Sequence, residues 1–136
     1  MLKAAVYCRV STADQTDEGF SLPSQLEACR RYAASNDLEV VAELAEDCSG
    51  ATPMNERREG QRLSAKVARG ELSAIVVHRV DRLSRDIVDL LTTVRAWLQA
   101  GVEVHAGDVG RIESELDIVL IIKGWQGGEE RSKIRE

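Results

Sequence analysis

The stretch Ala4-Ala5-Val6-Tyr7-Cys8-Arg9-Val10-Ser11-Thr12 decides the fold, because a short apolar run gives way to an arginine and a serine. An apolar run of this length is typical of a buried strand. In an open α/β sheet, ligands and reacting groups collect at the carboxyl ends of the strands. A second apolar run, residues 74–77, leads into Asp81-Arg82-Leu83-Ser84-Arg85. We therefore expect a sheet that brings these two strand ends together.

Strand and helix patterns alternate along the rest of the chain. Further strand signals lie at 39–44, 74–78 and 102–106, and helix signals lie at 22–35, 59–69 and 87–98. The third of these helices has the clearest apolar stripe, and Ser84 or Asp81 is expected to cap it. The alternation predicts an α/β fold, a three-layer α/β/α sandwich with a mostly parallel sheet of four to five strands.

The end of the chain has a different pattern. From Ile112 to Trp125 the sequence predicts a helix that is apolar over most of its circumference. A terminal helix with so much apolar surface needs a partner besides its own sheet, so an interface between subunits is expected. We predict a catalytic α/β domain at 1–110 and a helix for oligomerisation or linkage at 111–136.

The composition fits one globular domain. The chain has 136 residues, of which 43% are hydrophobic and 30% are charged, which is enough for a single core. The net charge is −5, yet eight lysines and arginines and only three acidic residues fall between residues 57 and 85. A basic segment on an acidic scaffold suits a protein that touches a polyanion at one place. Without an apolar span or a secretory signal, we expect a cytoplasmic protein that does not enter a membrane.

The side chains at the two strand ends favour phosphoryl transfer. Arg9 and Ser11 alternate along an extended segment, so they point to the same side. No histidine stands in a Ser-His-Asp order or beside a GxSxG elbow, which makes acyl transfer a poor fit. Arginine binds phosphate oxygens through a rigid fork and stays charged. A serine among arginines can therefore act on a phosphate without a metal ion.

Three other classes of protein were compared with this pattern. A flavodoxin-like or receiver-like binding module would suit Asp47 and Asp81 near strand ends, but it has no need of several arginines there. A P-loop enzyme requires GxxxxGK[ST], which is not in the sequence. A metal-dependent nuclease requires a carboxylate cluster, and none is evident. The cysteines Cys8, Cys29 and Cys48 are odd in number and widely spaced, which predicts reduced thiols.

Taken together, the motifs resemble those of the serine recombinases, the family of resolvases, invertases and large phage-type integrases. Tyr7-Cys8-Arg9-Val10-Ser11-Thr12-Ala13-Asp14-Gln15 resembles the family's Y-x-R-V-S-T-x-x-Q opening, and residues 81–85 resemble its D-R-L-x-R motif. Residues 19–25 look like the GxSxxxQ segment of the large members. Ser49-Gly50 with residues 58–63 looks like SG…RPGxxRL, except that Glu59 stands where the family usually has proline.

The resemblance implies a mechanism and a set of site residues. Ser11 would attack a DNA phosphate, leaving a 5′-phosphoserine link and a free 3′-hydroxyl. The phosphate would be bound by Arg9, Arg82 and Arg85. The resemblance implies that the site is completed or supported by Asp81, Gln25, Arg58, Tyr7 and Gln15.

The resemblance also implies partners and cofactors. The substrate would be double-stranded DNA attachment sites, cut by a homotetramer built from homodimers through the terminal helix. One ester is exchanged for another, so neither ATP nor a divalent ion is required. The family's C-terminal DNA-binding domain is expected to be absent from this chain.

Overall fold

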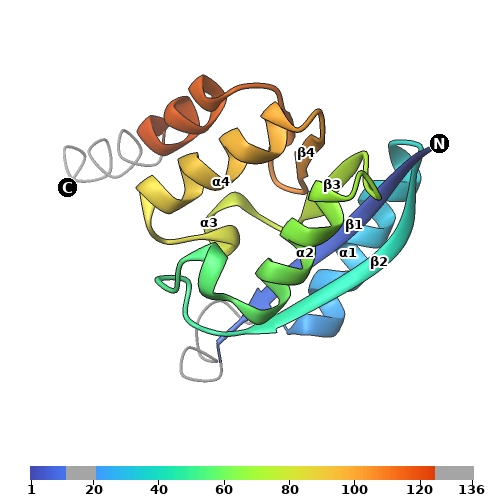
Figure 1. Cartoon of the computed structure of the whole chain (residues 1–136), viewed down its shortest axis with the longest axis horizontal. Coiled ribbons are helices and arrows are strands. Elements are labelled where there is room, and N and C mark those ends of the chain that lie inside the picture. Colours follow the sequence, from blue (N-terminus) through green and yellow to red (C-terminus); the bar gives the residue numbers. More distant parts are fainter. Residues whose placement is uncertain (12–20, 125–136) are drawn as a thin grey trace, which may run out of the picture.

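The computed structural model describes residues 1–11 and 21–124, which form a five-stranded sheet flanked by helices (Figure 1). In chain order the elements are β1 (Leu2–Val10), α1 (Leu22–Ser35), β2 (Leu38–Asp47), η2 (Met54–Glu56), α2 (Arg58–Ala68), β3 (Ala74–Val77), α3 (Val80–Leu83), α4 (Ile87–Gln99), β4 (Glu103–Ala106) and β5 (Gly110–Ile112). A last helix begins at residue 115 and reaches residue 124, where the described part ends. Within these residues no helix has the length and apolar composition of a membrane span.

The sheet has the strand order β2-β1-β3-β4-β5, with only the β4–β5 pair antiparallel. The predicted α/β sandwich with a mostly parallel sheet is confirmed. β1 is buried from Ala4 to Arg9, and every residue of β3 is buried, as expected of central strands covered on both faces. The chain passes from β1 to β2 on one side and later to β3 on the other. The carboxyl ends of β1 and β3 therefore flank the point where the strand order reverses.

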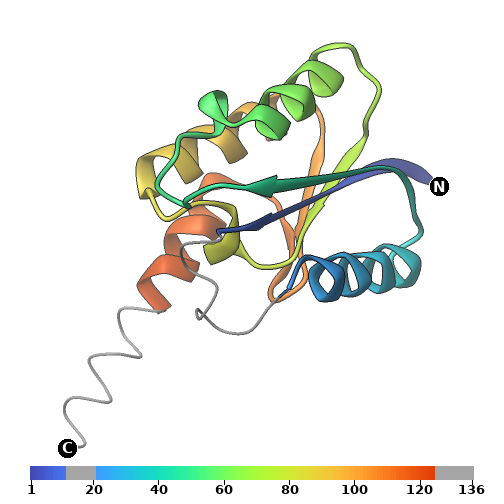
Figure 2. The same cartoon turned by 90° about the horizontal axis from the view of Figure 1, so that it is seen from below.

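The side chains of β1 alternate between the two faces of the sheet. Ala4, Val6 and Cys8 pack against α1. Ala5 and Tyr7 belong to the larger cluster on the opposite face, where the helices contribute Leu63, Leu90, Val94, Trp97 and Ile118. Figure 2 shows α1 on one side of the sheet and α2 and α4 on the other. Because a strand alternates with a period of two residues, Arg9 leaves β1 on the same face as Tyr7.

The segment before the last helix differs from the sequence prediction. Ile112 was expected in the helix, but it lies in β5 opposite Val104 of β4 and is only 2% exposed. Gly110 adopts a φ of +84°, a left-handed conformation that glycine accepts without strain and that lets the chain reverse. The apolar character of Ile112 therefore reflects burial in the sheet, and β5 crosses the boundary predicted after residue 110.

The start of α4 also differs from the prediction. Asp86, rather than Ser84 or Asp81, caps the helix, because its carboxylate accepts hydrogen bonds from the backbone N–H groups of Val88 at 2.9 Å and Asp89 at 3.2 Å. Asp81 lies in the short helix α3. β2 extends to Asp47, beyond the expected end at residue 44, which makes Glu46 a strand residue instead of a loop residue.

The cysteines are free, as the sequence predicts, and we expect them to differ in reactivity. Cys8 and Cys29 are buried with their Sγ atoms 4.0 Å apart, and the hydrogen bond to Cys29 together with burial raises the pKa of the Cys8 thiol. A thiol held in the protonated form is a poor nucleophile. Burial also raises the pKa of the Cys48 thiol, so the order of reaction follows from access. Under native conditions iodoacetamide should reach the half-buried Cys48 first and alkylate the buried Cys8 and Cys29 only as the protein unfolds. Mass spectrometry of timed samples tests this, and alkylation of Cys8 as fast as Cys48 would contradict it.

Candidate active site

The arginine-bearing segments after β1 and β3 meet at one edge of the sheet. Ser11 follows directly after β1 and is half-buried. α3 begins just after β3 and returns to β1, where the Nε of Arg9 donates a hydrogen bond to the backbone oxygen of Arg82 at 2.9 Å. This contact joins the two segments at the point where the strand order reverses. In open α/β sheets that point is a common ligand site.

Arg9 is a deeply buried charge at this edge, with an exposed fraction of 2%. Besides the bond from Nε, its Nη1 donates to the backbone oxygen of Cys48 at 2.8 Å. Its Nη2 is buried and finds no hydrogen-bond acceptor within residues 1–11 and 21–124. A buried donor without an acceptor is costly. An anionic oxygen bound at this edge would supply the acceptor that Nη2 lacks.

Three further arginines surround Arg9. Burial and the neighbouring charges of Arg57, Arg85 and Arg82 lower the pKa of Arg9. Arg82 is buried and Arg85 is exposed, so the cluster extends from the interior to the surface. Positive charges this close repel one another, and a bound anion offsets the repulsion. The electrostatics therefore favour a phosphate or another anion at this edge.

Gly50 allows two of the arginines to approach each other. A Cβ atom at this position would lie 2.8 Å from Cγ of Arg85 and 3.1 Å from Nη2 of Arg9. The carbonyl oxygen of Gly50 accepts hydrogen bonds from the backbone N–H of Arg85 at 3.0 Å and from Nη2 of Arg57 at 3.3 Å. The residue is therefore a contact point for three members of the cluster.

Replacing Gly50 with alanine should displace Arg85 and so impair phosphate binding. We expect the overpacking to lower the free energy of unfolding by about 1 kcal/mol and the rate of any reaction at this site by roughly tenfold or more. Gly70→Ala is the matched control, because Gly70 has a φ of +70° but no atom within 4 Å of a Cβ. It should cost about as much stability through backbone strain without affecting the reaction. Equal loss of activity in both variants would contradict the contact role of Gly50.

Arg57, rather than Arg58, joins the cluster. Arg58 is exposed at the first residue of α2, whereas Arg57 is 1% exposed. The guanidinium of Arg57 donates to four oxygens, those of Leu83 at 2.7 Å, Thr52 at 2.9 Å, the Tyr7 hydroxyl at 3.2 Å and Gly50 at 3.3 Å. The sequence shows two adjacent arginines at a helix start and no sign of which one turns inward. Arg57 precedes the helix in an extended conformation. Its side chain therefore points in a different direction from that of Arg58, the first helical residue.

Glu46 and Tyr7 continue this network away from the arginines. One carboxylate oxygen of Glu46 accepts hydrogen bonds from the backbone N–H groups of Glu59 at 2.7 Å and Gly60 at 3.1 Å, and lies 3.4 Å from the donating Tyr7 hydroxyl. Burial raises the pKa of Tyr7, which keeps the hydroxyl protonated. Glu46 thus anchors the first turn of α2 and, through Tyr7, contacts Arg57. The sequence pattern did not identify Glu46, because the strand was expected to end before it.

The other expected site residues differ in whether they contact the arginine cluster. Gln25 is fully buried on α1, and its Nε2 donates to the backbone oxygen of Arg9 at 3.2 Å. Asp81 is half-buried and pairs with Arg79 at 3.1 Å. Gln15 lies outside the described residues. Gln25 therefore supports the end of β1 directly, whereas the carboxylate of Asp81 bonds to an arginine that is not one of the four.

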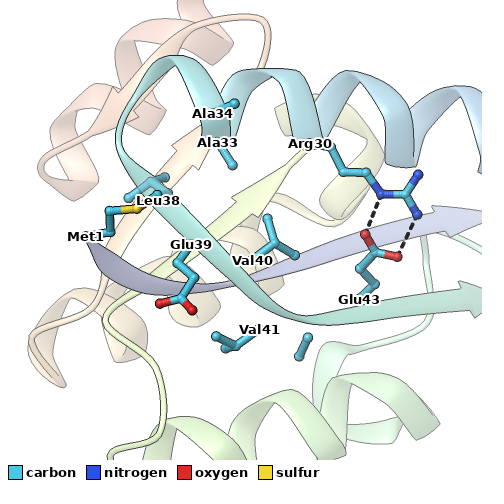
Figure 3. A pocket seen from close by; sticks show the side chains of 10 residues that line it. Met1, Arg30, Ala33, Ala34, Leu38, Glu39, Val40, Val41 and Glu43 are labelled. Atoms are coloured by element: carbon cyan, nitrogen blue, oxygen red, sulfur yellow. Dashed lines mark hydrogen bonds and ion pairs between the residues drawn. The ribbon is translucent and has the colours of Figure 1, made fainter.

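A surface pocket lies away from the arginine cluster, between α1 and β2 (Figure 3), with a volume of about 520 Å³. Its walls are mostly aliphatic, and its main charged groups, Arg30 and Glu43, neutralise each other in a two-bonded ion pair with distances of 2.5 and 2.7 Å. None of the expected site residues lines it. Within residues 1–11 and 21–124 no three histidine, cysteine or acidic side chains are grouped as metal ligands. The arginine cluster is therefore the candidate active site.

Comparison with known proteins identifies the family. Residues 4–136 match the family described as "Resolvase, N terminal domain". The chain belongs to this family. Among curated relatives it is 30% identical to the serine recombinase PinR of Escherichia coli K12 over 115 residues, which are 83% of this chain and 53% of PinR. It is 28% identical to the Tn2501 resolvase of Escherichia coli over 83% of this chain and 54% of that protein. The chain thus spans about half of these resolvase-family relatives.

Solved structures show the same resolvase-family fold. The N-terminal catalytic domain of TP901-1 integrase superposes with a TM-score of 0.75 and 26% identity, covering 98% of this chain and 99% of that domain. A resolvase family site-specific recombinase from Streptococcus pneumoniae superposes with a TM-score of 0.70 and 25% identity, covering 99% and 93%. The fold described above is therefore that of a serine recombinase catalytic domain.

Proposed function

We propose that this resolvase-family chain is the catalytic domain of a site-specific DNA recombinase that works through a covalent 5′-phosphoserine intermediate. The observation that carries the proposal is Arg9, a buried guanidinium two residues before Ser11 whose Nη2 finds no acceptor in residues 1–11 and 21–124. A phosphate oxygen would satisfy that donor and offset the charge of the neighbouring arginines. A DNA phosphate held there would lie beside the end of β1, where Ser11 stands.

The proposed reaction exchanges one phosphodiester for another. The Ser11 hydroxyl oxygen attacks the phosphorus and loses its proton, while the bond from phosphorus to the 3′-oxygen breaks and that oxygen gains a proton. The broken strand then carries a 5′-phosphate esterified to Ser11 and a free 3′-hydroxyl. A 3′-hydroxyl from another strand reverses the step and releases the serine. Because the ester bond is conserved, the scheme consumes no ATP and requires no metal ion.

We assign roles to the side chains from their contacts. Arg9, Arg82 and Arg85 bind the phosphate and stabilise the charge of the transition state, which is the main catalytic contribution in phosphoryl transfer. The positioning residues, which act through other groups, are Arg57, Tyr7, Glu46, Gln25 and Gly50. Asp81, Arg58 and Gln15 remain proposed site residues on the family resemblance.

The proposed partners are double-stranded attachment sites and further copies of this chain. The last helix packs on α4 through the buried Ile118 and an Arg95–Glu115 ion pair at 2.6 Å. Leu116 and Leu120 on the same helix are 62% and 56% exposed. This uncovered apolar surface supports assembly through the helix into a dimer and then a strand-exchanging tetramer. We place the reaction in the cytoplasm, beside bacterial DNA.

A trapping experiment tests the proposal. The full-length protein is mixed with a nicked duplex of its recombination site in the presence of EDTA, with either DNA end labelled. We expect a protein–DNA adduct at the 5′-phosphate end created by the break and, on the other fragment, a free 3′-hydroxyl that a polymerase extends. Loss of the adduct on chelation, or an adduct at the 3′ end created by the break, would contradict the mechanism. Duplex binding without any adduct would instead favour a non-enzymatic binding module.

A further inference from the structure

Two segments that carry parts of the arginine cluster are bridged by a side chain outside it. The first segment, residues 48–57, contributes the carbonyl of Cys48, Gly50 and Arg57. The second, residues 82–86, contributes Arg82 and Arg85. Both are short connections rather than long helices or strands, so their relative position depends on the bonds between them.

Asp89, in the first turn of α4, contacts both segments. Its two carboxylate oxygens accept the backbone N–H of Met54 at 3.2 and 3.3 Å. Its Oδ2 also accepts from the hydroxyl of Ser84 at 3.1 Å, a proton for which the backbone oxygen of Asp86, at 3.2 Å, is the second acceptor. Ser84 is 5% exposed and also accepts a hydrogen bond from the backbone N–H of Asp86 at 3.2 Å. The bonds from Met54 and Ser84 thus meet at one carboxylate.

The bridge lies next to the bond that fixes Arg85. Ser84 immediately precedes Arg85, whose backbone N–H donates to the Gly50 carbonyl at 3.0 Å. Met54 lies two residues after Thr52, whose N–H closes the turn that contains Gly50, and its backbone oxygen accepts the N–H of Arg57 at 3.2 Å. Loss of either bond to Asp89 would leave the segments joined by the Arg85–Gly50 and Arg57–Leu83 bonds, and this weaker connection would allow Arg85 to shift relative to Arg9. A displacement of about 1 Å in a catalytic group can cost two orders of magnitude in rate.

We propose that Asp89 is a positioning residue of this site, which acts through Ser84 and Met54 to hold Arg85 against the Gly50 turn. The inference rests on the proposed function, since it states how the arginines of that phosphate site are held in position. Asp89 acts as a hydrogen-bond acceptor and takes no part in proton transfer. An asparagine can accept the Met54 N–H through its single amide oxygen and donate its amide N–H to Oγ of Ser84, whose hydroxyl can then donate to the backbone oxygen of Asp86 3.2 Å away. Asparagine should therefore substitute for the aspartate.

The first test compares variants of the full-length protein in the trapping experiment. Asp89→Ala should slow adduct formation by roughly 100-fold. Asp89→Asn should slow it by no more than about threefold, as expected for a weakened neutral hydrogen bond, with an unchanged pH profile. Ser84→Ala should slow it, and Ser84→Ala combined with Asp89→Ala should be no slower than Asp89→Ala alone. Glu71→Gln, which removes one negative charge before the amino end of β3, should react like the wild type.

The second test does not depend on activity. Hydrogen exchange at the Met54 amide should accelerate in Asp89→Ala and stay protected in Asp89→Asn. Wild-type activity in Asp89→Ala, or an asparagine variant as slow as the alanine variant with Met54 still protected, would overturn the inference. If Asp89→Ala does not fold, Ser84→Ala and Asp89→Asn decide the question. If the wild type forms no adduct, the proposed function fails, while the exchange at Met54 still shows whether the bridge exists.

Discussion

Replacing Ser11 with alanine should abolish the covalent DNA adduct, with a loss of at least about 10⁴-fold in the rate of strand cleavage. The alanine has no oxygen to attack the phosphorus, and no other hydroxyl takes its place in the proposed scheme. Ser11 is half-buried at the end of β1, so its removal should change the free energy of unfolding by less than about 0.5 kcal/mol. Cleavage is measured by single-turnover assays and stability by urea denaturation.

Duplex binding separates loss of chemistry from loss of the site. The arginines are unchanged in Ser11→Ala, so the full-length variant should bind its recombination site as tightly as the wild type in a gel-shift assay. Ser11→Cys provides a second control, because a thiol at the same position can form a thiophosphate ester that reverses slowly. An alanine variant that still forms the adduct, or that loses DNA binding together with cleavage, would contradict the assigned role of Ser11.

Replacing Arg57 with methionine should destabilise the protein by about 3–5 kcal/mol, because each buried acceptor that loses its donor costs about 1–3 kcal/mol. The methionine fills much of the volume but leaves four oxygens without the donor that Arg57 provides, including the buried Leu83 and Gly50 carbonyls. It also interrupts the chain of hydrogen bonds in which Arg57 donates to the Tyr7 hydroxyl and that hydroxyl donates to the carboxylate of Glu46. Urea unfolding of the chain measures the change, and cleavage should fall as well because α3 and the Gly50 turn lose a common anchor.

Arg58→Met is the matched control for stability. The same side chain is removed one residue later, at an exposed position at the start of α2. A positive charge in the first turn of a helix is unfavourable, so its loss should leave stability within about 0.5 kcal/mol of the wild type or raise it slightly. Equal destabilisation by the two substitutions would show that burial and hydrogen bonding do not distinguish the two arginines.

The sequence was sufficient to predict the sheet and the meeting of two strand ends. The apolar run at 4–8 and the run at 74–77 are each followed by arginines, and parallel strands bring such ends to one edge. This prediction needs only the local apolar patterns and the rule that successive parallel strands of an α/β fold are joined by right-handed crossover connections. The placement of Arg9 and Arg82 at one edge follows from that regularity alone.

Residues that act through tertiary contacts were not predictable in this way. Arg57 and Arg58 have the same side chain, and only the turn before α2 directs one of them inward. Glu46 was assigned to a loop because the stretch from 46 to 56 contains Asp47, Ser49-Gly50 and Pro53. Its carboxylate is satisfied by the first turn of α2, a contact that local sequence does not encode. Ile112 was assigned to a helix because its spacing from the neighbouring apolar residues fits both the helix period and the strand period. The chain reversal at Gly110 places it in the sheet instead.

Mass spectrometry of the trapped complex tests the proposed mechanism most directly. The full-length protein is reacted with its nicked site, the DNA is digested to a short remnant, and the peptides are sequenced to find the residue that carries the phosphodiester. We predict that the remnant is linked to the hydroxyl oxygen of Ser11 and leaves phosphoserine there after complete digestion. A remnant on any other residue, or peptides that carry none although the DNA has been cut, would contradict it.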